Sequence, residues 1–186
     1  EGSNFEEEEN WEDAAAAYSR AIDVDSGEPY AHERLGWCLT KMGRNDEANQ
    51  AYKRAIATGT KEMFVYGRLV MNITKSGNGL DEALLYAREA IEIDPDHLGI
   101  HQIEGEVLIK LNRFKEAAES YRKAISLNKS EHSLYERLGL VYSEMGESDK
   151  AIKALKDAIA AGSQSRKIFS RLSSELSDDS RQLNKA

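Results

Sequence analysis

The residues best suited to binding a metal ion lie together in the middle of the sequence. His97 and His101 are four residues apart, and Asp94 and Asp96 stand just before them. A four-residue step places two imidazoles on one face of a helix, as in several metal sites. A third ligand at a motif-like spacing is missing from the sequence. We therefore predict that the chain binds no metal ion and needs no cofactor.

Residues suited to catalysis are few. The single cysteine, Cys38, lies between Trp37 and Leu39, so we expect it to pack as a small apolar residue. The acidic run at residues 6–9 reads as a solvated helix face, whereas acid–base catalysis needs two carboxylates held across a cleft. Residues 77–79, Gly-Asn-Gly, read as a turn between helices and not as a phosphate-binding loop. These features predict a protein that is not an enzyme.

The composition limits the classes of partner. The 186 residues include 33 acidic and 25 basic side chains, a net charge of -8. Nucleic-acid binding needs a basic surface, so we expect no nucleic-acid partner. No apolar run approaches the roughly 18 residues that a membrane span needs, so we expect no membrane insertion. A single cysteine fits a reducing compartment, and the expected location is cytoplasmic.

A repeat of about 34 residues organises the whole chain. Its clearest markers are alanines at intervals of 34, 35, 34 and 34 residues: Ala14, Ala48, Ala83, Ala117 and Ala151. After each marker, apolar residues follow at i+4 and i+7, as Tyr52 and Ala55 follow Ala48, which is one face of a helix. The preceding half of each repeat shows the same spacing, so each repeat is predicted to be a pair of helices.

Glycines at one position of the first helix need a packing reason, because glycine inside a helix costs about 1 kcal/mol relative to alanine. Gly36, Gly105 and Gly139 share this position, where a small residue facing the alanines of the second helix would let the two axes come close. Between the helices, Gly43, Asn112 and Gly146 are predicted to take the left-handed conformation that ends a helix. In the third repeat this turn is the longer Ser-Gly-Asn-Gly of residues 76–79.

These features resemble the tetratricopeptide repeat (TPR) family, in which Leu-Gly and an aromatic residue precede an Ala-aromatic-Ala helix and a closing proline. The residues that carry the resemblance include Leu138, Gly139, Tyr142 and Ala151 in one repeat and Ala83, Ala90 and Pro95 in another. Ala87 and Leu155 depart from it by replacing the aromatic residue. The match covers nearly the whole chain. Pentatricopeptide repeats, which bind RNA, are disfavoured by the acidic composition.

The resemblance implies an all-α fold: a right-handed α-solenoid, or superhelix, of stacked antiparallel helix pairs. We predict one array with a partial repeat at 1–28, four repeats at 29–61, 62–96, 97–130 and 131–164, a capping helix at 165–177 and a polar tail at 178–186. Gly2 and Phe5 match the end of a first helix, so we expect the sequence to be a fragment cut within a repeat. In the capping helix, Phe169, Leu172 and Leu176 form the predicted apolar face.

In the TPR family, the second, fifth, ninth, twelfth and thirteenth residues of each repeat line the concave surface. The predicted partner-binding residues at such positions are Tyr30, Trp37, Lys41, Phe64, Met71, Lys75, Gln102, Glu106 and Lys110. Large apolar side chains exposed together mark binding sites, so this groove is predicted to take an extended peptide or a partner helix. The alternative is that Tyr30 and Trp37 pack as ordinary core.

Arginine recurs at the sixth position of the repeats. This ladder consists of Arg34, Arg68, Arg137 and Arg171. It could bind anions through paired donors, or it could be structural and neutralised by Glu33, Glu104, Glu106 and Glu136, which is the reading we favour. The carboxylate clamp of chaperone-binding members is absent, because Glu33, Trp37, Arg68, Gly99 and Ile103 occupy its places.

Three functions remain open at this stage. The first is a protein-interaction scaffold with a groove for a protein or peptide. The second is a regulatory or substrate-positioning arm of a larger enzyme, for example a transferase. The third is self-assembly, because a truncated N-terminal repeat would expose apolar surface that another copy could cover.

Overall fold

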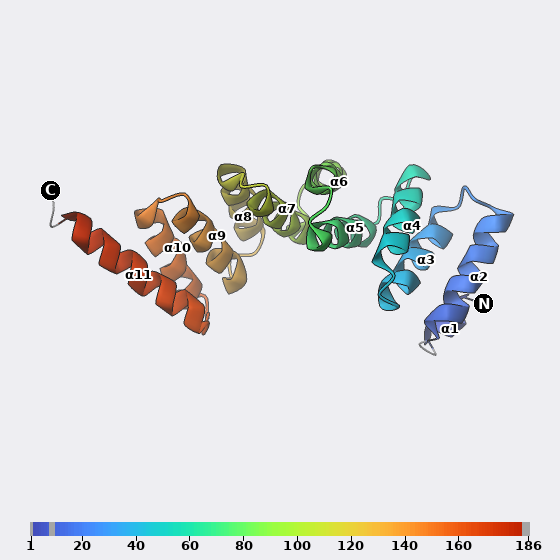
Figure 1. The fold of residues 1–186 in the computed structure, drawn as a ribbon, viewed down its shortest axis with the longest axis horizontal. Coiled ribbons are helices and arrows are strands. Elements are labelled where there is room, and N and C mark those ends of the chain that lie inside the picture. The colour runs from blue at the N-terminus through green and yellow to red at the C-terminus, as the bar shows by residue number, and fades with distance from the viewer. Residues whose placement is uncertain (1, 8–9, 184–186) are drawn as a thin grey trace. The chain divides into compact units, whose positions relative to one another are not determined.

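The computed structural model describes residues 2–7 and 10–183, and the side chains of Asn4, Phe5, Glu7 and residues 178–183 are left out of that description. Throughout this part of the chain the regular structure is helical, which confirms the predicted all-α solenoid of helix pairs. The chain divides into two compact units, one ending at Asp94 and the other beginning at Pro95. Figure 1 shows the helices of each unit, labelled in chain order.

Unit 1 contains α1 to α6. Their bounds are α1 Gly2–Glu7, α2 Trp11–Val24, α3 Pro29–Lys41, α4 Asn45–Ala57, α5 Met63–Ser76 and α6 Leu80–Ile93. Unit 2 contains α7 to α11. Their bounds are α7 Leu98–Lys110, α8 Phe114–Leu127, α9 His132–Glu144, α10 Ser148–Ala160 and α11 Arg166–Leu183. The repeat boundaries proposed from the sequence stay a prediction.

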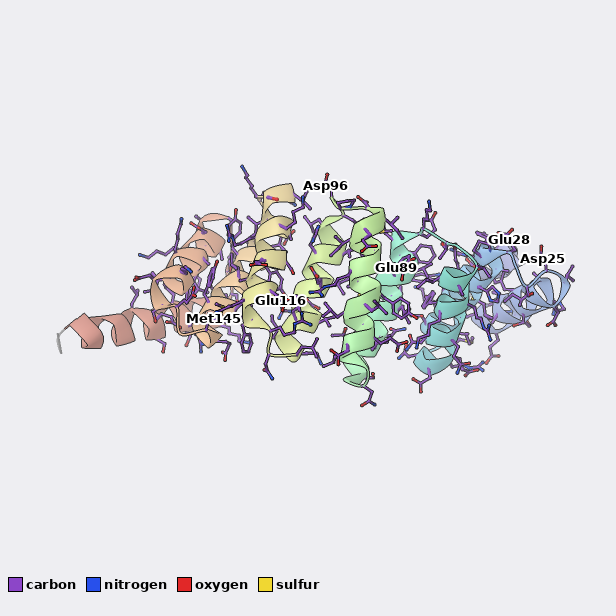
Figure 2. All side chains as sticks on the ribbon, turned by 90° about the horizontal axis from the view of Figure 1, so that it is seen from above. Asp25, Glu28, Glu89, Asp96, Glu116 and Met145 are labelled. Atoms are coloured by element: carbon purple, nitrogen blue, oxygen red, sulfur yellow. The ribbon has the colours of Figure 1, made fainter. Side chains whose placement is uncertain are left out.

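Local sequence signals explain where the helices begin and end. Pro29 begins α3, where its missing N–H costs no hydrogen bond. The turns within the helix pairs contain Gly43, Asn112 and Gly146 with φ of 75°, 57° and 71°. The predicted left-handed conformation at these three positions is therefore confirmed. At the other kind of turn, between α2 and α3, Asp25 accepts a 2.9 Å hydrogen bond from the backbone N–H of Gly27 (Figure 2).

Close packing within each helix pair explains the glycines in the first helices. A Cβ atom added to Gly36 would lie 2.5 Å from the Tyr52 ring, and one added to Gly105 would lie 2.7 Å from the Tyr121 ring. Such separations are far inside van der Waals contact. The glycines therefore lie against large side chains of the second helix, and the prediction that they face its alanines was wrong.

The second helices contribute a regular face of small and aromatic residues to the core. Ala48, Tyr52 and Ala55 of α4 are fully buried, as are Ala117, Tyr121 and Ala124 at the matching positions of α8. The i, i+4, i+7 face predicted from the sequence is thus confirmed in both units. In unit 1, α5 and α6 are also joined by a hydrogen bond of 3.0 Å that the Tyr66 hydroxyl donates to Glu89 (Figure 2).

The N-terminal helix follows the register expected for a first helix. A Cβ atom added to Gly2 would lie 2.6 Å from the Tyr18 ring, the same relation as Gly36 has to Tyr52. The alignment of Gly2 with the other glycines is therefore confirmed by packing. The side chain of Phe5, the second residue used in that alignment, lies outside the described residues.

The apolar face predicted for the last helix was wrong. Among the side chains of α11 up to residue 177, Ile168 is buried, at 1% exposure, whereas Phe169 and Leu176 are 47% and 42% exposed. Ile168 occupies the register position of the buried Leu134 in α9, which faces the preceding helix pair. Phe169 and Leu176 occupy the register positions of Tyr135 and Tyr142 in α9, which are half-buried. Helix α11 also continues to Leu183, beyond the residue 177 expected for the cap.

Candidate functional site

One side of the first helices in unit 1 carries the same four kinds of residue twice. We call this surface the unit 1 face, and it consists of Tyr30, Arg34, Trp37 and Lys41 on α3 and Phe64, Arg68, Met71 and Lys75 on α5. On each helix the spacing is i, i+4, i+7 and i+11, which keeps all four side chains on one side. Each helix thus presents an aromatic residue, an arginine, a second large apolar residue and a lysine, in that order.

Two aromatic residues of the unit 1 face are largely open to solvent. Tyr30 is 51% exposed and Phe64 is 38% exposed, while Trp37 and Met71 are half-buried. Tyr30 also packs edge-on against Tyr18 of α2, with ring centroids 6.4 Å apart. The interpretation of Tyr30 and Trp37 as ordinary core therefore fails for Tyr30 and holds only in part for Trp37.

Two cations lie over the indole of Trp37. The Lys41 Nζ atom is 4.7 Å from the ring centroid, and the Arg68 guanidinium carbon is 5.0 Å from it. Such contacts contribute about 0.5–1 kcal/mol at exposed sites. The contact with Arg68 joins α3 to α5, so it ties the two halves of the unit 1 face together.

A second tryptophan, Trp11, was missed by the sequence analysis. The Lys41 Nζ atom lies 5.4 Å from the Trp11 ring centroid, so one ammonium group contacts two indoles. Trp11 begins α2 and is partly buried against the core. A signal was present in the sequence, because Phe114 begins α8 at the same register position.

The first arginine of the ladder is neutralised within unit 1. Arg34 forms an ion pair with Glu6 of α1, and its Nε–H donates a hydrogen bond of 3.0 Å to that carboxylate. The neighbouring Cys38 is fully buried, as predicted. Burial raises the pKa of the Cys38 thiol, while the charge of Arg34 opposes that shift. The thiol therefore stays protonated at neutral pH and is a poor nucleophile.

The predicted site residues of unit 2 lie on α7. Gln102 and Glu106 are half-buried, and Lys110 is exposed in the last turn. Glu106 lies 3.7 Å from the guanidinium of Arg137 on α9, so this ladder arginine is neutralised by an acid that the sequence analysis named. Unlike the face of unit 1, this surface carries no aromatic residue at the second or ninth position.

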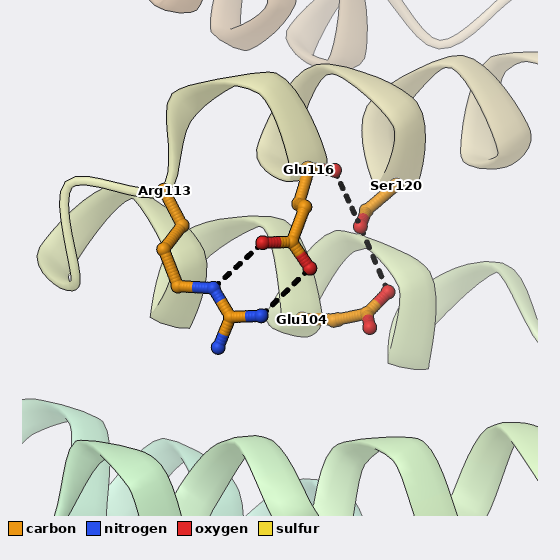
Figure 3. Close-up of polar contacts among 4 residues, drawn as sticks. All are labelled: Glu104, Arg113, Glu116 and Ser120. Atoms are coloured by element: carbon orange, nitrogen blue, oxygen red, sulfur yellow. Dashed lines mark hydrogen bonds and ion pairs between the residues drawn. The ribbon is translucent and has the colours of Figure 1, made fainter.

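Three other acids predicted to neutralise the ladder accept hydrogen bonds from hydroxyl groups. Glu104 accepts a hydrogen bond of 2.8 Å from the Ser120 hydroxyl, which also lies 3.1 Å from the carbonyl oxygen of Glu116, while Glu116 itself pairs with Arg113 (Figure 3). The other two carboxylates also accept hydrogen bonds from hydroxyl groups, Glu33 from Thr60 and Glu136 from Ser163. These buried or half-buried carboxylates thus connect loops and helices, and their pairing with the ladder arginines stays a prediction.

Unit 2 contains a groove of about 660 Å³ among α7, α8, α9 and α11. Its apolar wall includes Ile109, Phe114 and Leu140. Its polar wall includes Arg171, which contacts Glu144 at 3.2 Å and Glu175 at 3.4 Å. The ladder residues Arg137 and Arg171 both line this groove, but each is already paired with carboxylates.

The comparison with family models decides which family this is. Models described as "Tetratricopeptide repeat" match residues 1–62 and 132–161, and one described as "TPR repeat" matches residues 105–146. Together they cover more than half of the chain and both units. The chain belongs to the tetratricopeptide repeat family. A search of curated proteins found no match to this TPR sequence.

Solved structures agree with the TPR fold. The structure entitled "Crystal structure of YrrB: a TPR protein with an unusual peptide-binding site" has a TM-score of 0.83 at 18% identity, covering 91% of this chain and 87% of that one. A crystal structure of MamA has a TM-score of 0.80 at 21% identity, covering 86% and 93%. MamA from Desulfovibrio magneticus RS-1 has a TM-score of 0.77 at 13% identity, covering 86% and 90%. At these identities the likeness shows the fold alone.

The histidines of this TPR chain have structural contacts. The His97 Nδ1 atom accepts a hydrogen bond of 3.3 Å from the Ile100 N–H and thereby caps α7. The His101 Nε2 atom lies 2.8 Å from the carbonyl oxygen of Pro95. Over residues 2–7 and 10–183, no group of three or more His, Cys, Asp or Glu side chains is placed to hold a metal ion. Over the same range, no helix is long and apolar enough to cross a membrane.

A hydroxyl pair between the two helices of a TPR pair is complete in α3 and α4 and is broken in α7 and α8 and in α9 and α10. The Tyr52 hydroxyl lies 3.1 Å from the Thr40 hydroxyl. At the matching positions, Ile109 replaces the threonine opposite Tyr121, and Leu155 replaces the tyrosine opposite Ser143. The hydroxyls of Tyr121 and Ser143 are accordingly buried without a hydrogen-bond partner among the described residues.

Burial raises the pKa of Tyr52 and of Tyr121. For Tyr52, the Thr40 hydroxyl and the charges of Arg68 and Arg34 oppose that rise. For Tyr121, the carboxylate of Glu106 adds to the rise and Arg137 opposes it. The side chain of each core tyrosine is thus close enough to the ladder arginine of the next repeat for that charge to affect its pKa.

Replacing tyrosine by phenylalanine should have different effects on stability at Tyr121, whose hydroxyl is unpaired, and at Tyr52, whose hydroxyl is paired. Tyr121→Phe should leave the free energy of unfolding unchanged or raise it by about 1 kcal/mol, because it removes a buried polar group without a partner. Tyr52→Phe should lower it by about 1 kcal/mol, because it breaks the bond with Thr40. Urea unfolding of the two variants checks this. A loss of stability in Tyr121→Phe as large as in Tyr52→Phe would contradict the assignment.

Proposed function

We propose that this TPR chain is a protein-interaction scaffold that docks an extended segment or a helix of a partner on the unit 1 face. The observation that carries the proposal is the exposure of Tyr30 and Phe64 on neighbouring first helices, beside the half-buried Trp37 and Met71. Aromatic side chains on a surface favour protein binding because they bury a large apolar area on contact. An exposed aromatic pair with no role in binding would only lower the solubility of the protein.

The arrangement of the unit 1 face supports a protein or peptide ligand over a small molecule. The apolar residues recur along two helices, which suits a chain with side chains at intervals. The structure entitled YrrB is described as a TPR protein with a peptide-binding site, which is consistent with this class of ligand. No observation in unit 1 favours a regulatory arm of an enzyme over a scaffold.

The test is a pull-down from source lysate, read by quantitative mass spectrometry. The double variant Trp37→Ala, Phe64→Ala should retain at most about one-tenth of the partner held by the parent, because loss of a hot-spot residue costs about 2 kcal/mol. The control is Leu85→Ala on α6, which removes an apolar side chain that is 64% exposed and lies outside the unit 1 face. Circular dichroism should show the parent helix content in all variants.

The result of the pull-down shows whether the unit 1 face or another surface binds the partner. Loss of partner only in the double variant supports the unit 1 face. Equal capture by the parent and the folded double variant would show that another surface carries the contact and would contradict the proposal.

A further inference from the structure

We infer that the segment taken by the unit 1 face is acidic, with carboxylates at the end that meets Lys41 and Lys75 and an apolar side chain at the end that meets Tyr30 and Phe64. This inference rests on the proposed function, since it names the chemistry of the partner at that same surface. It follows from how charges are distributed over the eight residues and their neighbours.

The unit 1 face is positive although the chain as a whole is negative. Four of its eight residues are cationic and none is acidic, while the chain has a net charge of -8. Among the residues that the structure describes, Glu6 contacts the face, and it is paired with Arg34. The fifth residue of α3, Glu33, lies outside the unit 1 face, because it is buried and accepts a hydrogen bond from Thr60 in the loop before α5.

The charge is graded along the helices. Glu28 and Glu62 stand at the residues that precede α3 and α5, next to Tyr30 and Phe64, and the Glu28 carboxylate accepts a hydrogen bond of 3.3 Å from the Tyr30 N–H. Lysines stand in the last turn of both helices. An acidic ligand would be repelled at the aromatic end and attracted at the lysine end. This gradient sets the orientation as well as the charge of the segment.

Two cations of the face, Lys41 and Arg68, are held in place before binding. Lys41 lies over both Trp37 and Trp11, and Arg68 lies over Trp37. A side chain ordered on an aromatic ring loses less conformational entropy when it binds a ligand. A guanidinium stacked on a ring still presents its N–H donors in the plane, where a carboxylate can accept them. The tryptophans therefore act as platforms that position donors for carboxylates.

The same geometry disfavours an aromatic ligand stacked on Trp37. Lys41 and Arg68 already cover that indole, so a neutral aromatic side chain would have to displace a cation from it. The open apolar surface is instead at Tyr30 and Phe64, in the first turns of α3 and α5. Apolar contact and charge contact are thus separated along the unit 1 face.

A selection from a displayed library of random peptides tests the inference, with the full chain as bait. Peptides enriched on the parent should contain more Asp and Glu than Lys and Arg, together with an aromatic or leucine residue. The double variant Lys41→Glu, Lys75→Glu should lose this acidic excess, and its affinity for a peptide selected on the parent should fall at least about tenfold in low salt.

The control variant has the same change in net charge at another place. Lys115→Glu, Lys156→Glu alters two exposed lysines of α8 and α10 in unit 2. It should enrich the same acidic peptides as the parent. An equal loss in this control would show that the net charge, and not the unit 1 face, selects the peptides, which would overturn the inference.

A third bait, Trp37→Ala, Phe64→Ala, separates the two proposals. Peptides that need these aromatic residues but carry no acidic excess would overturn the acidic ligand and leave the docking face standing. Peptides enriched equally on this variant would contradict both proposals. A library from which the parent enriches nothing would also count against both.

Discussion

Replacing Ile168 by alanine should detach α11 from unit 2. Ile168 is 1% exposed, and truncation of a buried isoleucine costs about 2–5 kcal/mol. The other side chains of α11 up to residue 177 are half-buried or exposed. Because repeat arrays unfold partly in pieces, amide hydrogen exchange of residues 166–177 is a better readout than a single global transition.

The neighbouring residue provides the control for this prediction. Phe169→Ala removes a larger side chain, but that side chain is 47% exposed, so the free energy that holds α11 should change by less than about 0.5 kcal/mol. If Phe169→Ala accelerates exchange in α11 more than Ile168→Ala does, the face assigned to the core is the wrong one.

Replacing Tyr52 by alanine should have the largest effect in unit 1. The ring is fully buried against Gly36, and its hydroxyl meets Thr40. Deleting a buried aromatic side chain costs about 3–5 kcal/mol, because it leaves a cavity as well as losing apolar contact. Urea unfolding monitored by circular dichroism measures this change.

The effect of Gly36→Ala on stability should change sign when Tyr52 is already replaced by alanine. In the parent, Gly36→Ala should destabilise by about 1–3 kcal/mol, because the new methyl would overlap the Tyr52 ring. In Tyr52→Ala the methyl has room, and alanine should stabilise α3 by about 1 kcal/mol. Additive effects of the two substitutions in the double mutant would contradict the close contact between these residues.

The fold was predictable because its signals repeat. The alanine period located the second helices, and Gly43, Asn112 and Gly146 located turns whose left-handed conformation the structure confirms. The packing partners were less predictable. Periodicity shows which side of a helix is apolar but not which neighbour covers it, so Gly36 was assigned to alanines when it lies against Tyr52. The same gap led to Phe169 being assigned to the core in place of Ile168.

The candidate site was predictable in its residue types but not in its contacts. Register alone identified Tyr30, Trp37 and Phe64 on one side of neighbouring helices. It did not identify Trp11 of α2, which contacts Lys41, or Glu6 of α1, which pairs with Arg34. Both contacts depend on side-chain geometry. Long, flexible side chains can choose among several partners, and sequence spacing does not decide which one they meet.

The third helix pair of unit 1 has the large and small residues of the core exchanged. Val70 stands on α5 where α3 has Gly36, and Ala87 stands on α6 where α4 has Tyr52; both are fully buried. A bulky residue on one helix is thus matched by a small one on the other. Gene rearrangements that move an intact helix pair would keep this match. A crossover within the pairs that joins α3 to α6 or α5 to α4 would instead place glycine opposite alanine or valine opposite tyrosine, leaving a void or an overlap, so these two helix pairs can be exchanged without such a mismatch only as whole pairs.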